Sequence, residues 1–478
     1  MICDTPRILV AGTGSGCGKT TVSMALLAAL KSGLNLRAFK CGPDYIDPMF
    51  HERVLHVPCR NLDSYLLSAD TVRYLFAENS RGAELALIEG VMGYFDGLEN
   101  GDTGSTHEIA KILEAPVILV LNCRGRSRSA AAELLGFRTF ADDGLIAGVI
   151  FNEASPGVAG ALAGLARQAG VTPLGYMPRM RASLASRHLG LVTPDEAADL
   201  QEQIEELGRM AEATLDLEGI VRLARGAAPL AVAQPALPAG AGDFAAGLAG
   251  QEGQEAPGRE SVTIGVARDA AFCFLYEDNL RLLERLGARL AFFSPLTDTR
   301  LPEGISGLYL CGGYPELYAR QLSANRAMLA CVRKAAACGM PAFAECGGFL
   351  YLHDSLTDPD GEVYQMAGVI PAAARFTQKL QHFGYVSLQA GKDTLLLPKG
   401  GCVRAHEFHR TVSGAKQDAF TVRKGDRQWG GYIAEGNLLA GYPHIHFWSD
   451  PRMAARFIGR CREWAARLPG KDFHDERN

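Results

Sequence analysis

The stretch Gly12-Thr13-Gly14-Ser15-Gly16-Cys17-Gly18-Lys19-Thr20 decides the fold of the N-terminal part of the chain. It follows a short apolar run, residues 8–11, and it opens a helical pattern over residues 20–31. Glycines between a strand and a helix let backbone N–H groups point at phosphate oxygens, and the helix N-terminus attracts the same anion. The sequence therefore predicts a phosphate-binding loop (P-loop), with Gly12 standing one place before the position where the usual pattern has its first glycine.

This loop predicts the contacts of a bound nucleotide. We expect Lys19 to neutralise the β- and γ-phosphates and the Thr20 hydroxyl to bind Mg²⁺. The residues expected to contact ATP in the loop are Gly14, Gly16, Gly18, Lys19, Thr20 and Thr21. Kinases, transporters, GTPases and partitioning ATPases share such a loop. Partitioning ATPases carry a second lysine where this chain has Gly14, which counts against that class.

Four carboxylates are candidates for metal and substrate binding. Glu89 follows the apolar run 85–88, and Asp96 follows a flexible Gly-containing stretch. Asp44 and Asp47 lie three apart on a loop after a predicted strand. Because carboxylate oxygens suit Mg²⁺ and phosphoryl transfer, we expect Asp44, Asp47 and Glu89 to be metal ligands beside the P-loop threonine. Turn formation is the alternative interpretation of the two aspartates, since Gly-Pro-Asp and Asp-Pro are ordinary turn sequences.

Short apolar runs alternate with helical patterns over the first 151 residues, which predicts a doubly wound α/β domain with a parallel sheet. The predicted strands are residues 8–11, 85–88, 117–121 and 145–151, and a second helix is predicted over 105–113. After residue 225 the chain becomes rich in Ala, Gly, Pro and Gln, and a second α/β rhythm begins at 262. We therefore expect a nucleotide-binding domain over 1–225, a linker over 226–260 and a second domain over 261–465.

Composition limits the class of protein. The 478 residues are 47% hydrophobic and 21% charged with a net charge of −5, which is typical of a soluble globular chain of several domains. We expect neither a nucleic-acid partner nor a membrane partner, because there is no excess of basic residues and no long apolar segment. The 12 scattered cysteines and the N-terminal sequence, which does not resemble a signal peptide, predict a cytoplasmic protein.

A cysteine in the second domain has the context of a nucleophile. Cys346 lies between a predicted strand, residues 342–344, and the start of a helix, on a turn backed by Gly347. Such an elbow exposes the thiol, and the helix N-terminus is expected to lower its pKa. The N–H groups of Gly347 and of Gly313, which follows another predicted strand, are candidates for an oxyanion hole. We expect His444 to be the base, with His446 as the alternative; an inert buried cysteine and a structural histidine are the competing interpretation.

With both halves considered together, the chain resembles the cobyrinic acid a,c-diamide synthase family of glutamine-dependent amidoligases. The resemblance covers nearly the whole length and rests on ordered motifs: residues 12–20, 39–48, 61–63, 88–93 with 96–97, 187–191, 312–318, 344–348 and 406–409. It implies a P-loop, dethiobiotin synthetase-like parallel sheet followed by a class I glutamine amidotransferase-like α/β domain. It also implies that Asn152 contacts the purine of ATP.

The resemblance implies a ligase of cobalamin biosynthesis. ATP and Mg²⁺ would phosphorylate the a and c acetate groups of cobyrinic acid near Asp47 and Asp96, and glutamine would supply ammonia to the acyl phosphates. Other class I amidotransferases have a glutamate two residues after the catalytic histidine, where this chain has His446, so the resemblance implies a Cys–His dyad. Hydrogenobyrinic acid and nickel sirohydrochlorin remain alternative substrates. A P-loop switch ATPase with an inactive amidotransferase-like domain is the alternative class, and the oligomeric state stays open.

Overall fold

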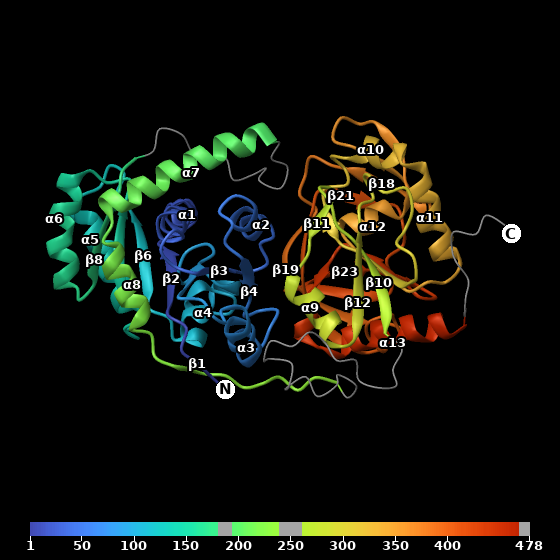
Figure 1. Cartoon of the computed structure of the whole chain (residues 1–478), viewed down its shortest axis with the longest axis horizontal. Helices are drawn as coiled ribbons and strands as arrows, with labels where there is room; N and C mark the ends of the chain where they lie inside the picture. The colour runs from blue at the N-terminus through green and yellow to red at the C-terminus, as the bar shows by residue number, and fades with distance from the viewer. Residues whose placement is uncertain (180–193, 239–260, 468–478) are drawn as a thin grey trace. The chain divides into compact units, whose positions relative to one another are not determined.

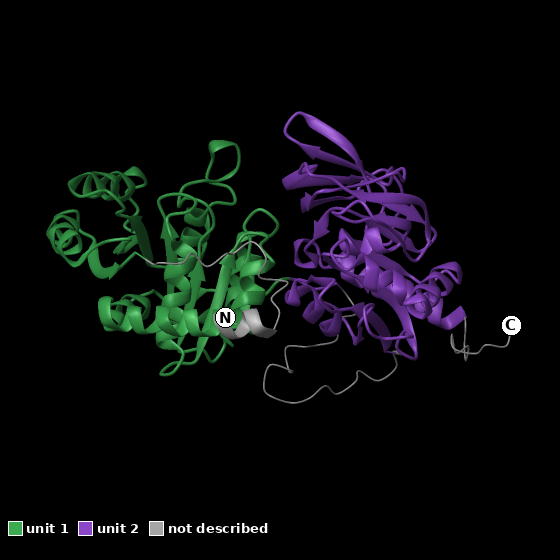
Figure 2. Cartoon of the chain, turned by 90° about the horizontal axis from the view of Figure 1, so that it is seen from above, with its two compact units in different colours: residues 1–235 green, residues 236–478 purple. Residues whose placement is uncertain are grey.

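The computed structural model describes residues 1–179, 194–238 and 261–467. The chain divides into two compact units, Met1–Pro235 and Ala236–Asn478, which Figure 2 shows in green and purple. The motif at residues 187–191 and most of the expected linker lie outside the described residues. Each unit has its own central sheet, as the two α/β rhythms predict.

Unit 1 is built on a parallel sheet of seven strands in the order β4-β3-β5-β2-β6-β7-β8 (Figure 1). The central strands read as continuous apolar runs because both faces of the sheet are covered. The strands are β2 Arg7–Gly12, β3 Leu36–Cys41, β4 Cys59–Leu62, β5 Leu85–Glu89, β6 Val117–Asn122, β7 Ile146–Asn152 and β8 Thr172–Met177.

Helices cover both faces of this sheet. Helices α1, α7 and α8 share one hydrophobic core with one face, whereas Phe39 of β3 packs its ring against Phe76 of α3. The helices are α1 Lys19–Leu30, α2 Ile46–Arg53, α3 Ala69–Asn79, α4 Thr106–Leu113, α5 Arg128–Phe140, α6 Pro156–Gln168, α7 Pro194–Thr214 and α8 Leu217–Arg225. The doubly wound α/β fold predicted for this half is confirmed.

Part of the expected linker is structured. Strand β9, Leu230–Ala231, pairs with strand β1, Ile2–Cys3, and Leu230 is fully buried. The buried guanidinium of Arg7 donates to the carbonyl of Ala228 at 2.6 Å. Unit 1 therefore runs to residue 235 rather than 225. Composition hides this strand because it is only two residues long and lies among Ala and Pro.

Unit 2 contains a six-stranded sheet in the order β12-β10-β13-β15-β25-β24. The first five strands run parallel, and β24 pairs antiparallel with β25. The strands are β10 Val262–Ala267, β12 Ala288–Phe293, β13 Ile305–Leu310, β15 Ala342–Glu345, β24 Ile433–Glu435 and β25 Leu438–Gly441. The helices are α9 Glu277–Arg285, α10 Ala319–Ala324, α11 Arg326–Ala337, α12 Gly347–Tyr351 and α13 Arg452–Arg467.

The chain after β15 forms two further sheets that the sequence analysis did not predict. One has the order β17-β16-β18-β21 and the other β23-β22-β19-β20-β26. Their strands are β16 His353–Thr357, β17 Val363–Gln365, β18 Ile370–Phe376, β19 His382–Ala390, β20 Cys402–His409, β21 Thr411–Ser413, β22 Phe420–Lys424, β23 Arg427–Gly431 and β26 His444–Ile445. Two short strands, β11 Phe272–Phe274 and β14 Gly312–Gly313, pair beside the central sheet.

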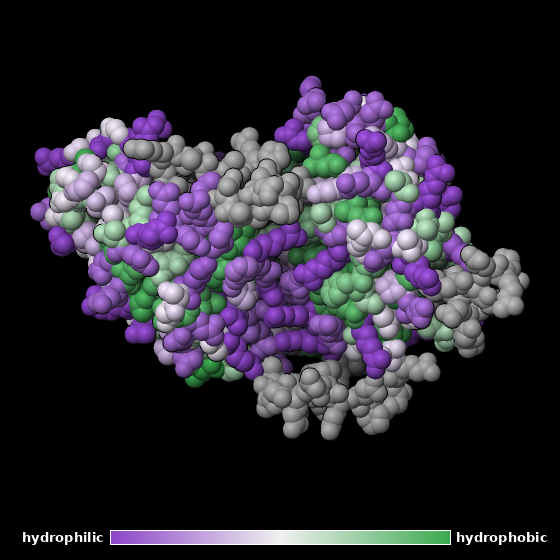
Figure 3. Space-filling model, turned by 45° about the horizontal axis from the view of Figure 1, so that its top comes forward, coloured by the Kyte–Doolittle hydropathy of each residue, from purple (hydrophilic) through white to green (hydrophobic). Residues whose placement is uncertain are grey.

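On the face drawn in Figure 3, hydrophobic residues form scattered patches among polar ones. In the part of the chain that the structure describes, the most exposed large hydrophobic side chain is Phe140, at 78%. Among the described residues no helix is both long and apolar enough to cross a bilayer.

Candidate functional site

The P-loop connects β2 to α1, as predicted. Gly16 and Gly18 have φ of 76° and 99°, a region that favours glycine. A Cβ atom at Gly12 would lie 2.1 Å from the sulfur of Cys17, so the loop closes directly against this residue. This close approach gives a physical reason for a glycine at position 12, one place before the usual first glycine of the loop.

Lys19 lies inside this loop. Its ammonium donates to the carbonyl oxygen of Gly14 at 2.9 Å, and burial lowers its pKa. Asn152, at the end of β7, donates to the carbonyl of Cys17 at 2.9 Å and packs against Gly18. The structure thus gives Asn152 a contact that braces the P-loop, and its expected contact with a purine stays a prediction.

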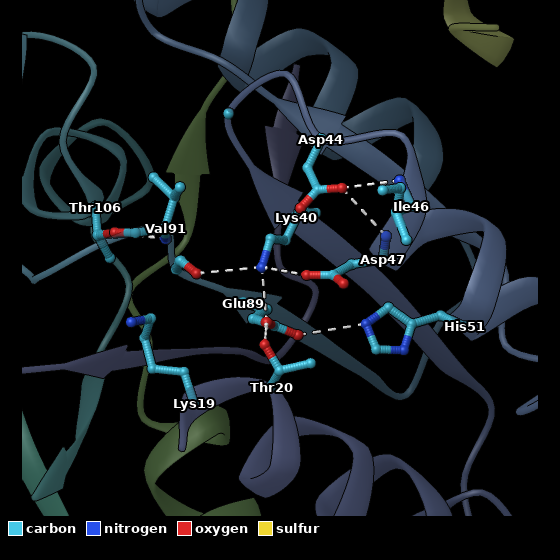
Figure 4. Close-up of polar contacts among 12 residues, drawn as sticks. Lys19, Thr20, Lys40, Asp44, Ile46, Asp47, His51, Glu89, Val91 and Thr106 are labelled. Carbon is cyan, nitrogen blue, oxygen red and sulfur yellow. Dashed lines mark hydrogen bonds and ion pairs between the residues drawn. The ribbon is translucent and has the colours of Figure 1, made fainter. Parts of the chain in front are cut away.

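A buried network of charges lies beside the P-loop (Figure 4). Lys40 is at its centre, with its ammonium 2.7 Å from Glu89 Oε1 and 2.6 Å from Asp47 Oδ2. The hydroxyl of Thr20 donates to Glu89 at 2.6 Å, and His51 Nε2 lies 3.4 Å from the other Glu89 oxygen. The structure therefore brings together three of the four expected metal ligands, Thr20, Asp47 and Glu89.

The Lys40 ammonium contacts two buried carboxylates, and the pKa values of these two carboxyl groups are shifted in opposite directions. Burial by itself would raise the pKa of Glu89, but Lys40 and His51 outweigh it and lower this pKa well below its usual value. Burial raises the pKa of Asp47 to about 6 despite the contact with Lys40. Burial alone would lower the pKa of Lys40, but the negative charges of Glu89 and Asp47 outweigh burial and raise this pKa. Glu89 is thus the firmly ionised member.

Sequence reasoning missed Lys40 and His51. Lys40 is the second-last residue of β3 and is the register partner of Glu89 on β5, so these two side chains lie on the same face of the sheet. Treating residues 36–41 as a strand of the parallel sheet would have placed Lys40 next to Glu89. His51 follows Asp47 by one helical turn on α2, and that spacing was its only signal.

The other two expected carboxylates contact backbone groups. Asp44 Oδ1 accepts from the N–H groups of Ile46 and Asp47 at 2.8 and 3.2 Å, which starts helix α2 as turn chemistry predicts. Asp96 accepts from the N–H of Gly93 at 2.9 Å and closes its loop. Direct roles of Asp44 in metal binding and of Asp96 near substrate stay predictions, as does a nucleotide contact by Thr21.

The residues present suit Mg²⁺. Mg²⁺ prefers oxygen ligands and is commonly held by one or two side chains together with substrate phosphates and water. The Thr20 hydroxyl and the carboxylates of Glu89 and Asp47 supply such oxygens beside the P-loop, and Glu89 Oε2 has His51 Nε2 as a neighbour at 3.4 Å. Lys40 supplies the positive charge that balances these carboxylates in the structure.

In unit 2, Cys346 lies on the predicted elbow between β15 and α12. Its φ of 44° and ψ of −97° are unfavourable for a side-chain-bearing residue, and its N–H donates to Gly441 O at 2.7 Å. A Cβ at Gly347 would lie 2.9 Å from the nitrogen of Gly313, so the two backbones expected to hold an oxyanion touch one another. Gly313 has φ of 155°, and a Cβ there would meet Ala271 O at 2.1 Å.

His444 lies beside the same glycines. A Cβ at Gly312 would lie 2.4 Å from His444 Cε1, which places this ring against β14, the strand formed by Gly312 and Gly313. Burial, with smaller contributions from the neighbouring histidines 406 and 409, lowers the pKa of His444 to about 3. The imidazole is therefore neutral at physiological pH and can accept a proton.

The thiol does not have the lowered pKa expected from a helix N-terminus, so that expectation is wrong. Burial raises the pKa of Cys346, and the charges of Glu316, Glu407 and Glu345 add to the effect. Helix α12 is only five residues long and does not offset these contributions. In this structure the pair therefore rests as a neutral thiol and a neutral imidazole.

His446, the alternative base, occupies a structural position. Its Nδ1 accepts from the N–H of Trp448 at 3.3 Å, and its ring packs on Tyr276. The residue before the nucleophile, Glu345, accepts from the N–H of Ile445 at 2.7 Å and thereby fixes the segment between the two histidines. The Cys–His dyad stays a prediction.

Two family models match the chain, one in each unit. A CobQ/CobB/MinD/ParA nucleotide binding domain matches residues 8–192, and a CobB/CobQ-like glutamine amidotransferase domain matches residues 263–452. Over 95% of its length the chain is 39% identical to the cobyrinate a,c-diamide synthase of Dehalococcoides mccartyi, 97% of which is covered. The chain belongs to the cobyrinate a,c-diamide synthase family.

Other cobyrinate a,c-diamide synthases are similar over the same span. The synthase of Priestia megaterium is 37% identical over 95% of this chain and 97% of its own length. That of Salmonella typhimurium is 38% identical over 95% of this chain and 98% of its own length. As a member of the cobyrinate a,c-diamide synthase family, the chain is an enzyme of the ligase class, with a nucleotide-binding unit and a glutamine amidotransferase unit.

Proposed function

We propose that the chain uses ATP, Mg²⁺ and glutamine to convert the a and c acetate groups of cobyrinic acid to amides, through acyl phosphates, in cobalamin biosynthesis. The observation that carries the proposal is the presence of two separate reaction centres on one chain. One is the P-loop with its buried carboxylates, and the other is the Cys346 elbow beside His444. The names of the relatives supply the substrate class.

In unit 1 the residues are suited to phosphorylating a carboxylate. The P-loop backbone and Lys19 would hold the β- and γ-phosphates of ATP, while Thr20, Glu89 and Asp47 would hold Mg²⁺. Mg²⁺ neutralises charge on the phosphates when bound. The acetate oxygen attacks the γ-phosphorus, ADP leaves, and an acyl phosphate forms. Ammonia then attacks the acyl carbon and displaces inorganic phosphate.

In unit 2 the residues are suited to releasing ammonia from glutamine. The Cys346 sulfur attacks the carboxamide carbon while its proton passes to His444, and the carbonyl oxygen becomes an oxyanion held by the Gly313 and Gly347 N–H groups. His444 returns the proton to the departing nitrogen, so ammonia leaves and a γ-glutamyl thioester remains. Water then hydrolyses the thioester to glutamate. Because both groups rest neutral, proton transfer accompanies the attack rather than preceding it.

The experiment is mass spectrometry of cobyrinic acid, hydrogenobyrinic acid and nickel sirohydrochlorin after incubation with the enzyme, ATP, Mg²⁺ and glutamine. Ammonium serves as the alternative nitrogen source. We expect two amidations of cobyrinic acid with either source. Amidation of one of the other tetrapyrroles alone would reassign the acceptor, and hydrolysis of ATP without hydrolysis of glutamine and without amidation would favour a switch ATPase.

A further inference from the structure

A buried pair of ionisable residues on β20 has no part in the steps above. Glu407 and His409 are 2% and 5% exposed, and Glu407 Oε1 lies 2.9 Å from His409 Nε2. The other ring nitrogen of His409 lies 2.7 Å from the carbonyl oxygen of Thr411. A carbonyl oxygen only accepts, so His409 Nδ1 donates to Thr411, and the ring is held with Nε2 facing Glu407.

One carboxylate oxygen of Glu407 lacks a hydrogen-bond partner among the described residues. Oε1 is occupied by His409, whereas Oε2 is buried and has no hydrogen-bond partner within the described residues. An unsatisfied buried carboxylate oxygen is costly, and such atoms in native proteins call for a specific explanation. A bound donor would satisfy it. The fold already fixes the side chain, so the acceptor is preorganised.

The contacts of the pair lead to the nucleophile. The His409 ring stacks on Tyr442 with centroids 3.6 Å apart and planes 2° apart. Tyr442 packs edge-on against Phe349 of α12, the helix that begins directly after Cys346, and it follows Gly441, whose carbonyl accepts from the Cys346 N–H. Strand β20 also pairs with β26, with His406 opposite His444, so Glu407 directly follows the register partner of the expected base. After burial and Glu316, the charge of Glu407 also contributes to the raised pKa of Cys346.

The donor substrate carries one compact cation. When the carboxamide carbon of glutamine is at the Cys346 sulfur, three carbon atoms separate it from the α-nitrogen, so the α-ammonium group is held within reach of the same pocket. An ammonium has three donors and is best matched by a fixed carboxylate. We propose that Glu407 Oε2 binds the α-ammonium group of the donor glutamine, with His409 as the residue that positions Glu407. This assignment rests on the proposed function.

A consequence for reactivity follows from the charges. In the free enzyme the carboxylate near Cys346 disfavours the thiolate, because like charges repel. An ammonium bound to Glu407 offsets that charge and favours the thiolate when glutamine is present. Recognition of the substrate and activation of the nucleophile would then depend on the same contact.

The test compares glutamine with glutaramate, which is glutamine without its α-amino group, in wild type and Glu407→Gln. The substitution keeps the shape of the side chain and removes its charge. We expect kcat/KM for glutamine to fall by about 10- to 100-fold, mainly through KM, because a hydrogen bond to a charged group is lost. We expect kcat/KM for glutaramate to change by less than about threefold, because that substrate never makes the contact.

Three controls separate the outcomes. Glu362→Gln, at an exposed position of unit 2, is expected to behave as wild type with both substrates. Ammonium-dependent amidation is expected to survive in Glu407→Gln, and alkylation of Cys346 by the neutral reagent iodoacetamide is expected to become faster. If Glu407→Gln does not fold, Glu407→Asp is the second variant. Its side chain is one carbon shorter, so the charge is kept but lies farther from the ammonium, and the same selective loss for glutamine is expected.

Equal losses for glutamine and glutaramate would overturn the assignment, because they would place Glu407 at the carboxamide or in the fold. A selective loss in Glu316→Gln but not in Glu407→Gln would overturn it in favour of Glu316, the half-buried carboxyl that also influences Cys346. A wild-type enzyme that amidates with ammonium but never hydrolyses glutamine would instead overturn the glutaminase part of the proposed function, and the assignment with it.

Discussion

Cys346 combines an unfavourable backbone conformation with a protonated thiol. Positive φ at a residue with a side chain costs on the order of 1–3 kcal/mol and persists only where the surrounding structure enforces it. Here the N–H of Cys346 is fixed by Gly441, and the next two glycines pack on Gly313 and Leu310. The cost of this conformation is consistent with a functional role for the thiol.

Cys346→Ala is expected to abolish glutamine-dependent amidation and to leave ammonium-dependent amidation within about twofold of wild type, because only the thiol is removed and the phosphoryl chemistry lies in unit 1. Product formation with each nitrogen source, measured by mass spectrometry, checks this. Loss of both activities in a folded variant would show that the two reaction centres are not separable.

Asp47→Asn is expected to lower ATP-dependent amidation by at least about tenfold while glutaminase activity stays within about twofold, because one of the two carboxylates around Lys40 loses its charge. Steady-state assays of the two half-reactions measure the difference. Asp142→Asn is a matched control, since that side chain is 91% exposed on the same unit. If Asp47→Asn catalyses ATP-dependent amidation at the wild-type rate, turn formation would be the only role left for Asp47.

At the scale of elements, β13 and α12 pack closely in the amidotransferase unit. A Cβ at Gly348 would lie 2.1 Å from the carbonyl oxygen of Leu310 on β13. Backbone atoms on both sides leave no flexible group to move away. The elbow can therefore approach the sheet only if this position is glycine.

Gly348→Ala is expected to destabilise unit 2 by about 2 kcal/mol or more, because the helix must move off the strand. Urea unfolding followed by tryptophan fluorescence measures it. Gly459→Ala, in helix α13 with open space around the new methyl group, is the control and is expected to be neutral or to stabilise by up to about 1 kcal/mol. Equal effects of the two substitutions would contradict the close packing at Gly348.

Glu345 holds the segment between His444 and His446 and is protonated in the folded state. Burial raises the pKa of Glu345 to about 8. Between pH 4.5 and 8 the unfolded state releases this proton whereas the folded state keeps it, so stability falls as pH rises. The buried histidines 444 and 446 act in the opposite direction, but only below pH 6.5. Glu316, whose pKa burial raises to about 7, acts in the same direction as Glu345 but mainly below neutrality, so Glu345 has the larger effect above pH 7.

Between pH 7 and 8 the wild-type unit 2 is expected to lose stability with a slope of up to about 1.4 kcal/mol per pH unit, and Glu345→Gln is expected to have a flatter profile. Urea unfolding at several pH values, with tryptophan fluorescence, provides the measurement. Parallel profiles for the two proteins would show that Glu345 is ionised in the folded state.

At the scale of the whole molecule, the distribution of tryptophan lets the units be observed separately. All three tryptophans, residues 429, 448 and 464, lie in unit 2. Each unit has its own sheet and core, so we expect two unfolding transitions in calorimetry, of which fluorescence reports one. Saturating Mg-ATP is expected to raise the other transition, because a ligand stabilises the unit that binds it. A matching shift of the fluorescence transition would contradict independent unfolding.

The sequence predicts the parts of this fold that depend on local patterns. Runs such as residues 117–121 are apolar throughout because parallel strands are buried on both faces, and β6 lies there. The sheets between residues 353 and 431 were missed because their short strands alternate in exposure and pair with distant segments, as β20 does with β26.

The same distinction holds for the candidate site. Gly18, Lys19, Cys346 and Gly347 lie in contiguous motifs, so their placement follows from sequence. The direction of the pKa shift of the thiol was predicted wrongly because its main cause, burial of Cys346, and the smaller effects of Glu316 and Glu407 arise only when the chain folds.

The short pairing of β1 with β9 joins the beginning of unit 1 to its end. A ribosome adds residues in order, so the partner of Ile2 and Cys3 emerges only after every other strand of that unit. The first strand of unit 2, β10, begins at Val262, about thirty residues later. Synthesis therefore gives the nucleotide-binding unit time to close before the amidotransferase unit begins to form, which separates two sheets that could otherwise mispair.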